Sequence, residues 1–546
     1  MATTIDRVIA PRFDKHGVAS YPSVTSPPSE SFAICYMVPD RIIPVIFVPG
    51  VMGTNLGENI DKKKPPIAPV WLLNSGMGMA KDWITKNAKS RKKLLRPDNT
   101  DVFRGGDIPQ GSIQTDTELR RRGWGEVGFS SYAEILVWLE KTLNDFNDPH
   151  NGPRVGLIEQ VLEGAVKMDK VVRDEIALTY KYRFPVHAVG YNWLDSNAKS
   201  AERLQLKINE FIAFYQKNFK CEQVIVVTHS MGGLVARYCS ENLGMQSKIL
   251  GIVHGVMPAI GAAAVYRRMK AGTENPDKGT WKSAAGGLAS EVLGGNAAEM
   301  TAVLSSAPGP LQMLPGMEYG MRWLKFHDGK NELAQMSLPK ADPYSEIYTV
   351  RGKWWSLCDD FLIDPRDEKK ERIETDWINF TNVIRLHVKK FHEKLQGKYH
   401  PHTYAFIGVD QTKAAYGQVQ WTFQPSSNYS HETLPNDLLD VSFQRGKGEG
   451  YEQPIEPRRP TRFVGQPAHP SLMPMRISTP EEAGDGTVPQ RSGRGVKDHA
   501  KAYFELQRVE HEPAYKNENA HAQRAALYGI VKIAQRIKDV AGMAYK

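Results

Sequence analysis

Residues Gln223-Val-Ile-Val-Val-Thr-His-Ser-Met-Gly-Gly-Leu-Val-Ala-Arg237 pass from a β-branched run to a helical pattern within a few positions. A short apolar run of this kind, ending at Thr228, predicts a buried strand. After Gly232 and Gly233 the apolar residues recur with the helical period, and Gly244 stands where a helix C-cap is expected. The stretch therefore predicts a strand, a tight turn and a helix in direct succession.

The segments on either side repeat this alternation. Strands are predicted at 41–49, 184–190, 223–228, 249–256 and 404–409, and amphipathic helices at about 200–218 and 520–541. Strands that alternate with helices pack as a parallel sheet with both faces covered. The sequence therefore predicts the α/β class, with a doubly wound, mostly parallel sheet.

The turn at Thr228-His-Ser-Met-Gly232 has the composition of a nucleophile elbow, in which a strand delivers a serine into a sharp turn before a helix. Ser230 is the predicted nucleophile, and the backbone N–H of Met231 is a predicted oxyanion donor. Thr228 stands where such motifs usually have glycine, so a slightly wider turn is expected. His229 is predicted to be structural, with its side chain directed away from the active-site side. The alternative is that Ser230 only caps the helix.

A second oxyanion donor is expected in the loop after an early core strand. Pro49-Gly-Val-Met-Gly53 is a glycine-bearing turn directly after the strand predicted at 41–49. The Val51 N–H, or else that of Met52, is the predicted donor. A plain tight turn is the alternative interpretation.

The acid is predicted at Asp485, between Gly484 and Gly486, in a turn after the last core strands that the pattern indicates. A carboxylate on such a turn can orient an imidazole without steric interference. Asp195 and Asp410 compete, but Asp195 precedes the nucleophile and Asp410 has no histidine motif close behind it. A turn-forming role for Asp485 stays open.

The base is predicted at His511, in a loop just before the final helix, in agreement with the chain order serine, acid, histidine. His499 and His521 are its rivals, and His521 falls inside the predicted helix. An exposed, non-catalytic histidine is the alternative.

Composition narrows the classes of protein. The net charge of +9 favours anionic partners, but no nucleic-acid motif is present, so nucleic-acid binding is not expected. No run reaches the roughly 18 apolar residues of a membrane span, and no secretory signal peptide is recognisable, so synthesis in the cytoplasm is expected. The 4 cysteines are far apart and predict neither a disulfide framework nor a zinc site. No metal and no organic cofactor are expected.

The predicted layout has four parts. They are a flexible N-terminal arm at 1–40, a first core part at 41–265 with an irregular insertion at about 55–180, a lid and helical cap at 266–400, and a second core part at 401–546 with a proline-rich loop at about 445–475.

Three motifs together resemble the α/β-hydrolase lipases of the lecithin:cholesterol acyltransferase group, which includes lysosomal phospholipase A2 and the GPI inositol-deacylases. Val45-Ile-Phe-Val-Pro-Gly-Val-Met-Gly53 is similar to their oxyanion loop, His229-Ser-Met-Gly-Gly-Leu-Val-Ala-Arg237 to their elbow, and Gly484-Asp-Gly-Thr-Val488 to their acid turn. Tyr191-Asn-Trp193 and Ser306–Pro315 resemble further segments of the group. The resemblance implies an α/β-hydrolase fold with large cap insertions and hydrolysis of acyl esters by Ser230, Asp485 and His511.

The large insertions and the missing signal peptide also resemble the lipase effectors of type VI secretion systems. Such a resemblance implies export into a target cell's periplasm, membrane phospholipid as substrate, and two protein partners, a cognate immunity protein and a component of the secretion apparatus. Two other functions stay open. One is a cytoplasmic carboxylesterase or acyltransferase on small esters, and the other is a non-catalytic binding protein of the same fold.

Overall fold

The computed structural model describes residues 5–8, 12–13, 19–21, 31–34, 39–59, 64–66, 68–74, 83, 85–145, 151–272, 294–423, 437–441, 443, 452–455 and 473–544. Much of the predicted arm at 1–40, the middle of the predicted lid and most of the predicted loop at 445–475 lie outside these residues.

A seven-stranded sheet forms the centre of the molecule. Its order is β10 (Val186–Ala188), β5 (Val45–Val48), β11 (Val224–His229), β12 (Ile249–Gly255), β14 (Thr403–Gly408), β20 (Ala500–Leu506) and β9 (Ala165–Lys167). The first six strands run parallel, and β9 is antiparallel to β20. The predicted doubly wound, mostly parallel sheet is therefore confirmed.

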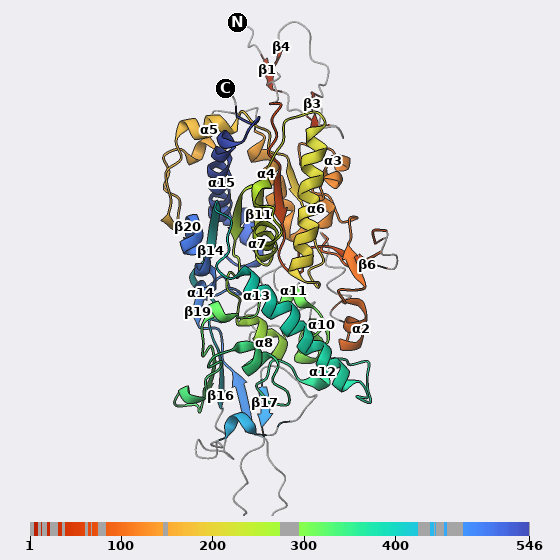
Figure 1. Cartoon of the computed structure of the whole chain (residues 1–546). Helices are drawn as coiled ribbons and strands as arrows, with labels where there is room; N and C mark the ends of the chain where they lie inside the picture. The colour runs from red at the N-terminus through yellow and green to blue at the C-terminus, as the bar shows by residue number, and fades with distance from the viewer. Residues whose placement is uncertain are drawn as a thin grey trace, which may run out of the picture.

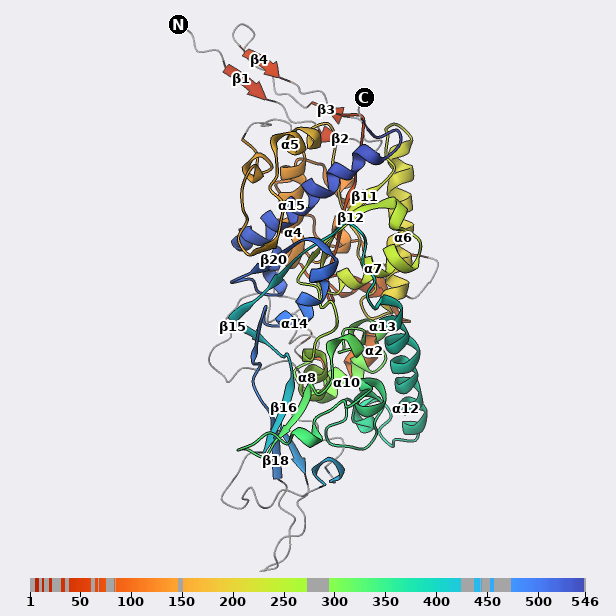
Figure 2. The same ribbon diagram turned by 60° about the vertical axis from the view of Figure 1, so that its left-hand side comes forward.

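Alternating side chains of the central strands divide the core into two. Ile46 and Val226 pack with α6 (Asn197–Gln216) and α7 (Gly232–Asn242) on one face, while Phe47 and Val227 pack with α4 (Phe129–Leu143) and α15 (Ala520–Ala534) on the other. Figures 1 and 2 show the two helical layers on opposite sides of the sheet. Buried on both faces, these strands are almost wholly apolar, which is why their sequence signal is strong.

The insertion at 55–180 is more regular than the sequence predicted. Its described residues form a three-stranded antiparallel sheet, four α-helices and the edge strand β9. Before β9 come, in chain order, β6 (Leu56–Glu58), β7 (Pro69–Trp71), α2 (Ala88–Leu94), β8 (Thr100–Val102), α3 (Asp116–Arg121) and α4. After β9 comes α5 (Arg173–Thr179). Its short strands and the brief helices α2, α3 and α5 span too few residues to show a clear period in the sequence. In contrast, α4 buries apolar side chains at helical spacing from Tyr132 to Leu143, so its pattern was present in the sequence and was overlooked.

The cap lies at one end of the molecule, with both chain termini at the other (Figures 1 and 2). Its helices are α8 (Ala264–Ala271), α10 (Ala297–Leu304), α11 (Pro308–Leu311), α12 (Ile373–Asn382) and α13 (Lys390–Leu395), with π-helical turns at Tyr344–Tyr348 and Val383–Lys389. A four-stranded sheet completes it, in the order β13 (Leu324–His327), β16 (Val419–Phe423), β18 (Met473–Ile477) and β17 (Glu452–Ile455).

Two expectations about this region are corrected by that sheet. The cap is not purely helical, and three of its strands come from the segment predicted to return to the core after residue 400. In particular, β18 pairs with β16 and β17 and not with the central sheet. The acid turn also does not follow the last core strand, because β20 comes after Asp485. Short alternating strands at 419–423 and 473–477 could not be assigned to one sheet or the other from sequence alone.

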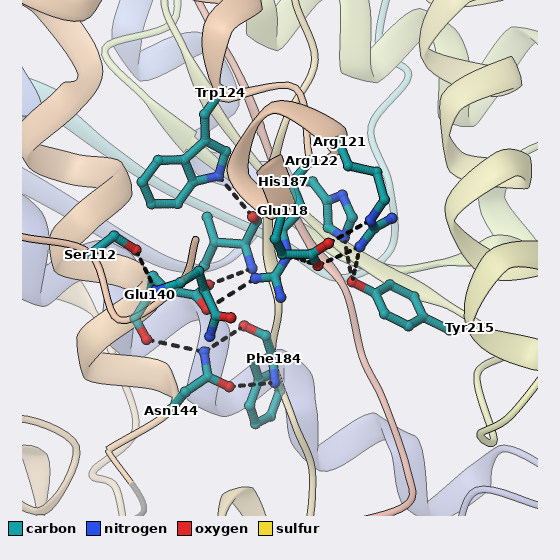
Figure 3. Close-up of polar contacts among 12 residues, drawn as sticks. Ser112, Glu118, Arg121, Arg122, Trp124, Glu140, Asn144, Phe184, His187 and Tyr215 are labelled. Carbon is teal, nitrogen blue, oxygen red and sulfur yellow. Dashed lines mark hydrogen bonds and ion pairs between the residues drawn. The ribbon is translucent and has the colours of Figure 1, made fainter. Parts of the chain in front are cut away.

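Figure 3 shows a buried polar network that fastens α3 and α4 to the edge strand β10. The guanidinium of Arg122 binds Glu118 at 2.7 Å and Glu140 at 3.0 Å, and the second oxygen of Glu140 accepts the backbone N–H of Val186 at 2.9 Å. Burial alone would raise the pKa of Glu118, but Arg121 and Arg122 hold it below its usual value. Because all these charges are paired, the insertion is attached to the core without an isolated buried charge.

Among the residues that the structure describes, no helix combines the length and apolar character needed to cross a membrane.

Candidate active site

Ser230 lies in a strained turn between β11 and α7. Its φ angle is 50°, in the left-handed region that a serine seldom adopts. The turn is held by a hydrogen bond from the Ser230 N–H to the carbonyl of Gly255 on β12, at 2.9 Å. Gly232 permits the close approach of α7, since a Cβ there would lie 2.4 Å from the carbonyl oxygen of Pro49. These are the geometric features of a nucleophile elbow.

The structure brings together the three residues predicted to form a catalytic triad. The Ser230 hydroxyl donates to Nε2 of His511 at 2.8 Å, and Nδ1–H of His511 donates to the carboxylate of Asp485 at 2.9 Å. Ser230 is 2% exposed and Asp485 is 3% exposed. The three residues thus have the spacing needed to pass a proton from the serine to the imidazole.

The turn around Asp485 fixes both the carboxylate and the histidine. One carboxylate oxygen accepts the backbone N–H groups of Thr487 and Val488, at 2.9 and 2.7 Å, which leaves the other oxygen for His511. The backbone N–H of His511 also donates to the carbonyl of Asp485 at 2.9 Å. His511 is therefore attached to the acid turn through both its side chain and its backbone.

The rival residues have other partners. Asp195 pairs with Lys199, and His521 pairs with Glu163. His499 stacks on the ring of Tyr399, with 4.3 Å between centroids. Asp410 accepts hydrogen bonds from Thr412 and from the backbone N–H of Arg508. Within the described part of the chain, none of these four rivals is hydrogen-bonded to Ser230 or His511.

The loop after β5 lies against the nucleophile. A Cβ on Gly50 would be 3.1 Å from the Cβ of Ser230. The turn is closed by a hydrogen bond from the Gly53 N–H to the Gly50 carbonyl at 3.1 Å and braced by the Trp71 indole N–H, which donates to the Met52 carbonyl at 2.8 Å. The backbone N–H groups of Val51, Met52 and Met231 make no hydrogen bond within the described residues. Free, braced N–H groups beside a nucleophile are suited to bind an oxyanion, and the predicted donor Val51 is among them.

Sequence reasoning missed the aromatic residues that support the site. Tyr132 on α4 and Tyr515 in the base loop are both buried, and their hydroxyls bind His229 and the Thr228 carbonyl, respectively. Tyr132 stands at an apolar position of a helix, so it reads as an ordinary core residue, and Tyr515 ends a 3-10 turn that no sequence pattern marks. Among the described residues, no group of histidine, cysteine, aspartate or glutamate side chains is arranged to hold a metal ion.

A serine at a strained strand–helix elbow, on a mostly parallel sheet with a histidine after β20, the last strand in the chain, defines the α/β-hydrolase fold, and that predicted fold is confirmed. The family model described as lecithin:cholesterol acyltransferase matches residues 161–281, which include the elbow. The predicted resemblance to this group is thereby confirmed.

The crystal structure of the Tle4-Tli4 complex contains a similar chain. That chain and this one share 29% sequence identity and superpose with a TM-score of 0.69, over 90% of this chain and 98% of the other. No curated protein matches the sequence. Together the comparisons support an enzyme that acts on lipids as a hydrolase or acyltransferase.

Proposed function

We propose that this protein is a serine hydrolase that cleaves the acyl ester bonds of membrane glycerophospholipids. The observation that carries the proposal is the hydrogen-bonded triad of Ser230, His511 and Asp485. Such a triad activates a hydroxyl that is otherwise a weak nucleophile. No metal or organic cofactor takes part in the proposed reaction.

In the first half of the reaction, Nε2 of His511 accepts the Ser230 proton as the serine oxygen attacks the ester carbonyl. The negative charge that develops on the carbonyl oxygen is stabilised by the N–H groups of Met231 and Val51. Asp485 holds the imidazole in the tautomer with Nδ1 protonated and stabilises the imidazolium. His511 then donates its proton to the departing lysophospholipid alkoxide, which leaves an acyl group on Ser230.

In the second half, water enters and gives a proton to Nε2 of His511 while its oxygen attacks the acyl carbonyl. The same N–H groups stabilise the second tetrahedral intermediate. The proton returns from the imidazole to the serine oxygen as the fatty acid leaves, and the enzyme is regenerated.

Lipid as substrate is supported by the match to the lecithin:cholesterol acyltransferase model and by the burial of the nucleophile. Because Ser230 is 2% exposed, a substrate must displace covering side chains before it reaches the oxygen. We assign this movement to α8 and α10, the described helices of the predicted lid at 266–310, whose residues 273–293 lie outside the described structure. α8 of this lid touches the acid turn, where Arg268 donates to the Thr487 hydroxyl at 3.2 Å. The net charge of +9 would favour an anionic bilayer surface.

A role as a type VI secretion effector belongs to the same proposal. It is supported by the likeness to a chain of the Tle4-Tli4 complex, in which two proteins are bound to each other. By analogy, this protein would bind a cognate immunity protein and a component of the secretion apparatus, and would act in the periplasm of a target cell.

The test compares fatty-acid release from anionic phospholipid vesicles with that from a short soluble ester, for the wild type and for Ser230→Ala. We expect strong release from vesicles and its loss in the variant. Activity on the short ester alone would favour a cytoplasmic carboxylesterase or acyltransferase. No activity on either substrate would favour a non-catalytic binding protein. Vesicle activity that survives Ser230→Ala would overturn the assignment of the nucleophile.

A further inference from the structure

Next to the proposed triad, two buried side chains connect the three loops that form the site. The backbone N–H of Gly50 donates to the Tyr132 hydroxyl at 3.0 Å, and that hydroxyl lies 2.9 Å from Nδ1 of His229. On the other side of the ring, Nε2 of His229 lies 2.7 Å from the backbone carbonyl of His511. The chain of contacts thus runs from the oxyanion loop, through the elbow, to the loop of the base.

The two ends of this chain fix the direction of every hydrogen bond. An amide N–H can only donate, so the Tyr132 oxygen accepts from Gly50 and its own proton points to Nδ1 of His229. A carbonyl oxygen can only accept, so Nε2 of His229 carries the proton given to His511. His229 is therefore the neutral tautomer with Nε2 protonated. Burial lowers the pKa of His229 to about 3, and the nearby His511 adds to this effect, so the ring stays neutral at working pH.

We propose that Tyr132 and His229 are positioning residues, which set the oxyanion loop and the base loop relative to Ser230. The inference rests on the proposed ester hydrolysis, since it concerns the geometry of that reaction. Within the described residues, the His229 side chain makes no hydrogen bond to Ser230 or Asp485. It acts through the His511 carbonyl, and Tyr132 acts through the Gly50 N–H. The sequence predicted a structural role for His229, with its side chain directed away from the active-site side, and assigned no role to Tyr132.

The packing around the two rings leaves them one arrangement. Tyr132 lies edge-on to His229, with 5.6 Å between centroids, and tilts against Phe47 at 5.1 Å. Tyr515 closes the remaining side of His229 at 6.0 Å. Both Tyr132 and His229 are at most 3% exposed, so water does not compete for their hydrogen bonds. A rigid link of this kind transmits small displacements instead of absorbing them.

Three variants separate the two halves of the link. Tyr132→Phe keeps the ring but removes the acceptor for Gly50 and the donor to His229. His229→Asn keeps a polar group near Nδ1 for Tyr132 and loses the bond to His511. His229→Gln keeps a donor near Nε2 for His511 and loses the acceptor for Tyr132. The matched control is Tyr528→Phe. Tyr528 lies on α15, and its hydroxyl likewise accepts a backbone N–H and donates to a backbone carbonyl, both of them from Asp169.

The experiment measures kcat and KM on phospholipid vesicles, with the concentration of functional sites counted by a fluorophosphonate probe and the melting temperature recorded for each protein. We expect each of the three variants to lower kcat by about 10- to 100-fold with little change in KM, because a misplaced reacting group slows chemistry and not binding. The double variant Tyr132→Phe/His229→Asn should lose little more than its worse parent, since the two residues act as one unit. Tyr528→Phe should lower the melting temperature and leave kcat unchanged.

The proposal is overturned if the three variants lower only the melting temperature and keep kcat per functional site, or if the losses in the double variant simply multiply. Loss of activity in Ser230→Ala together with either result would leave the proposed function intact and reject only the positioning link. Retained activity in Ser230→Ala would instead reject the proposed function itself.

Discussion

Asp410 begins β15 (Asp410–Ala415) and Asp485 directly follows its partner strand β19 (Glu482–Gly484), and of these two residues Asp485 carries the carboxylate that is bonded to His511. Asp410 is in register with Gly484, the residue before Asp485. The carboxylate of Asp485 reaches His511, whereas that of Asp410 holds the backbone N–H of Arg508, three residues before the histidine. One carboxylate orients the imidazole, and the other supports the loop that carries it.

This arrangement predicts unequal effects of two matched substitutions. Asp485→Asn should lower kcat about 10⁴-fold, because an amide favours the wrong tautomer of His511. Asp410→Asn keeps an oxygen that can accept the Arg508 N–H, and should cost about tenfold or less. Steady-state kinetics on phospholipid vesicles decide the matter, and equal losses in the two variants would contradict the assignment.

A second pair of substitutions tests the base. His511→Ala removes the only histidine that is bonded to Ser230 within the described residues, and kcat should fall about 10⁶-fold. His521→Ala serves as the control, because His521 is half-exposed and pairs only with Glu163 on the surface. Its activity should stay within about twofold of the wild type. Full activity in His511→Ala would show that another group takes the serine proton.

The close contact at Gly50 predicts that a single methyl group will disturb the site. In Gly50→Ala the new Cβ would lie 2.9 Å from Nδ1 of His229 and 3.1 Å from the Cβ of Ser230, so the oxyanion loop must move. We expect kcat to fall about 100-fold while the fold is retained. Gly156→Ala is the control, since a Cβ there meets nothing within 4 Å. Wild-type kcat in Gly50→Ala would mean that this loop does not hold the oxyanion.

The buried network of Figure 3 predicts a large effect on stability. Arg122→Met would leave Glu118 and Glu140 buried without their shared cation, and should lower the free energy of unfolding by about 3–5 kcal/mol. Removing the exposed pair of Arg96 and Asp98 by Asp98→Asn should cost at most about 1 kcal/mol. Urea unfolding followed by circular dichroism measures both values, and similar losses would show that the network is not a structural fastening.

Histidines whose pKa is lowered by burial, among them His187, His229 and His254, predict loss of stability in mild acid. Burial lowers the pKa of His187, His229 and His254, and for the last two it falls to about 3. Below the unfolded-state pKa of about 6.5, the unfolded chain binds protons that the folded chain cannot accept. The free energy of unfolding should therefore fall as the pH drops below this value, by up to about 1.4 kcal/mol per pH unit for each histidine.

The measurement is urea unfolding at several pH values between 7.5 and 5 (roughly one unit on either side of the unfolded-state pKa). Replacing one of these histidines, as in His254→Asn, should make the slope shallower by about one proton. A slope that is unchanged in His254→Asn would show that His254 takes up its proton in the folded state as well.

The sequence predicted best those strands whose side chains are buried on both faces of the sheet. Strands buried on both faces, such as β11 and β12, have continuous apolar runs, and both were predicted close to their observed bounds. β20 was missed because Lys501 and Glu505 interrupt its apolar residues, since this strand carries polar side chains next to the short edge strand β9. The small cap strands alternate over so few residues that they have no distinctive period.

The candidate site followed the same division. Ser230, Asp485 and His511 stand in short motifs with a local chemical logic, so chain order and turn composition were enough to select them. The functions of Tyr132 and Trp71 depend on contacts between segments that are distant in the sequence, at separations of 97 and 19 residues from their partners. No local pattern encodes such a contact, and an alignment of related sequences would be needed to find it.

The cap sheet makes the lid inseparable from the chemistry. The chain leaves the core for the cap, returns for β14, enters the cap again through β16, β17 and β18, and only then arrives at Asp485. Exchanging the cap for that of a relative, as is often attempted with lids to change substrate range, therefore requires two separate splices, the second of them directly beside the acid. Because Asp485 and His511 both come after this second excursion, a chain that stops within the cap sheet has neither the candidate acid nor the candidate base.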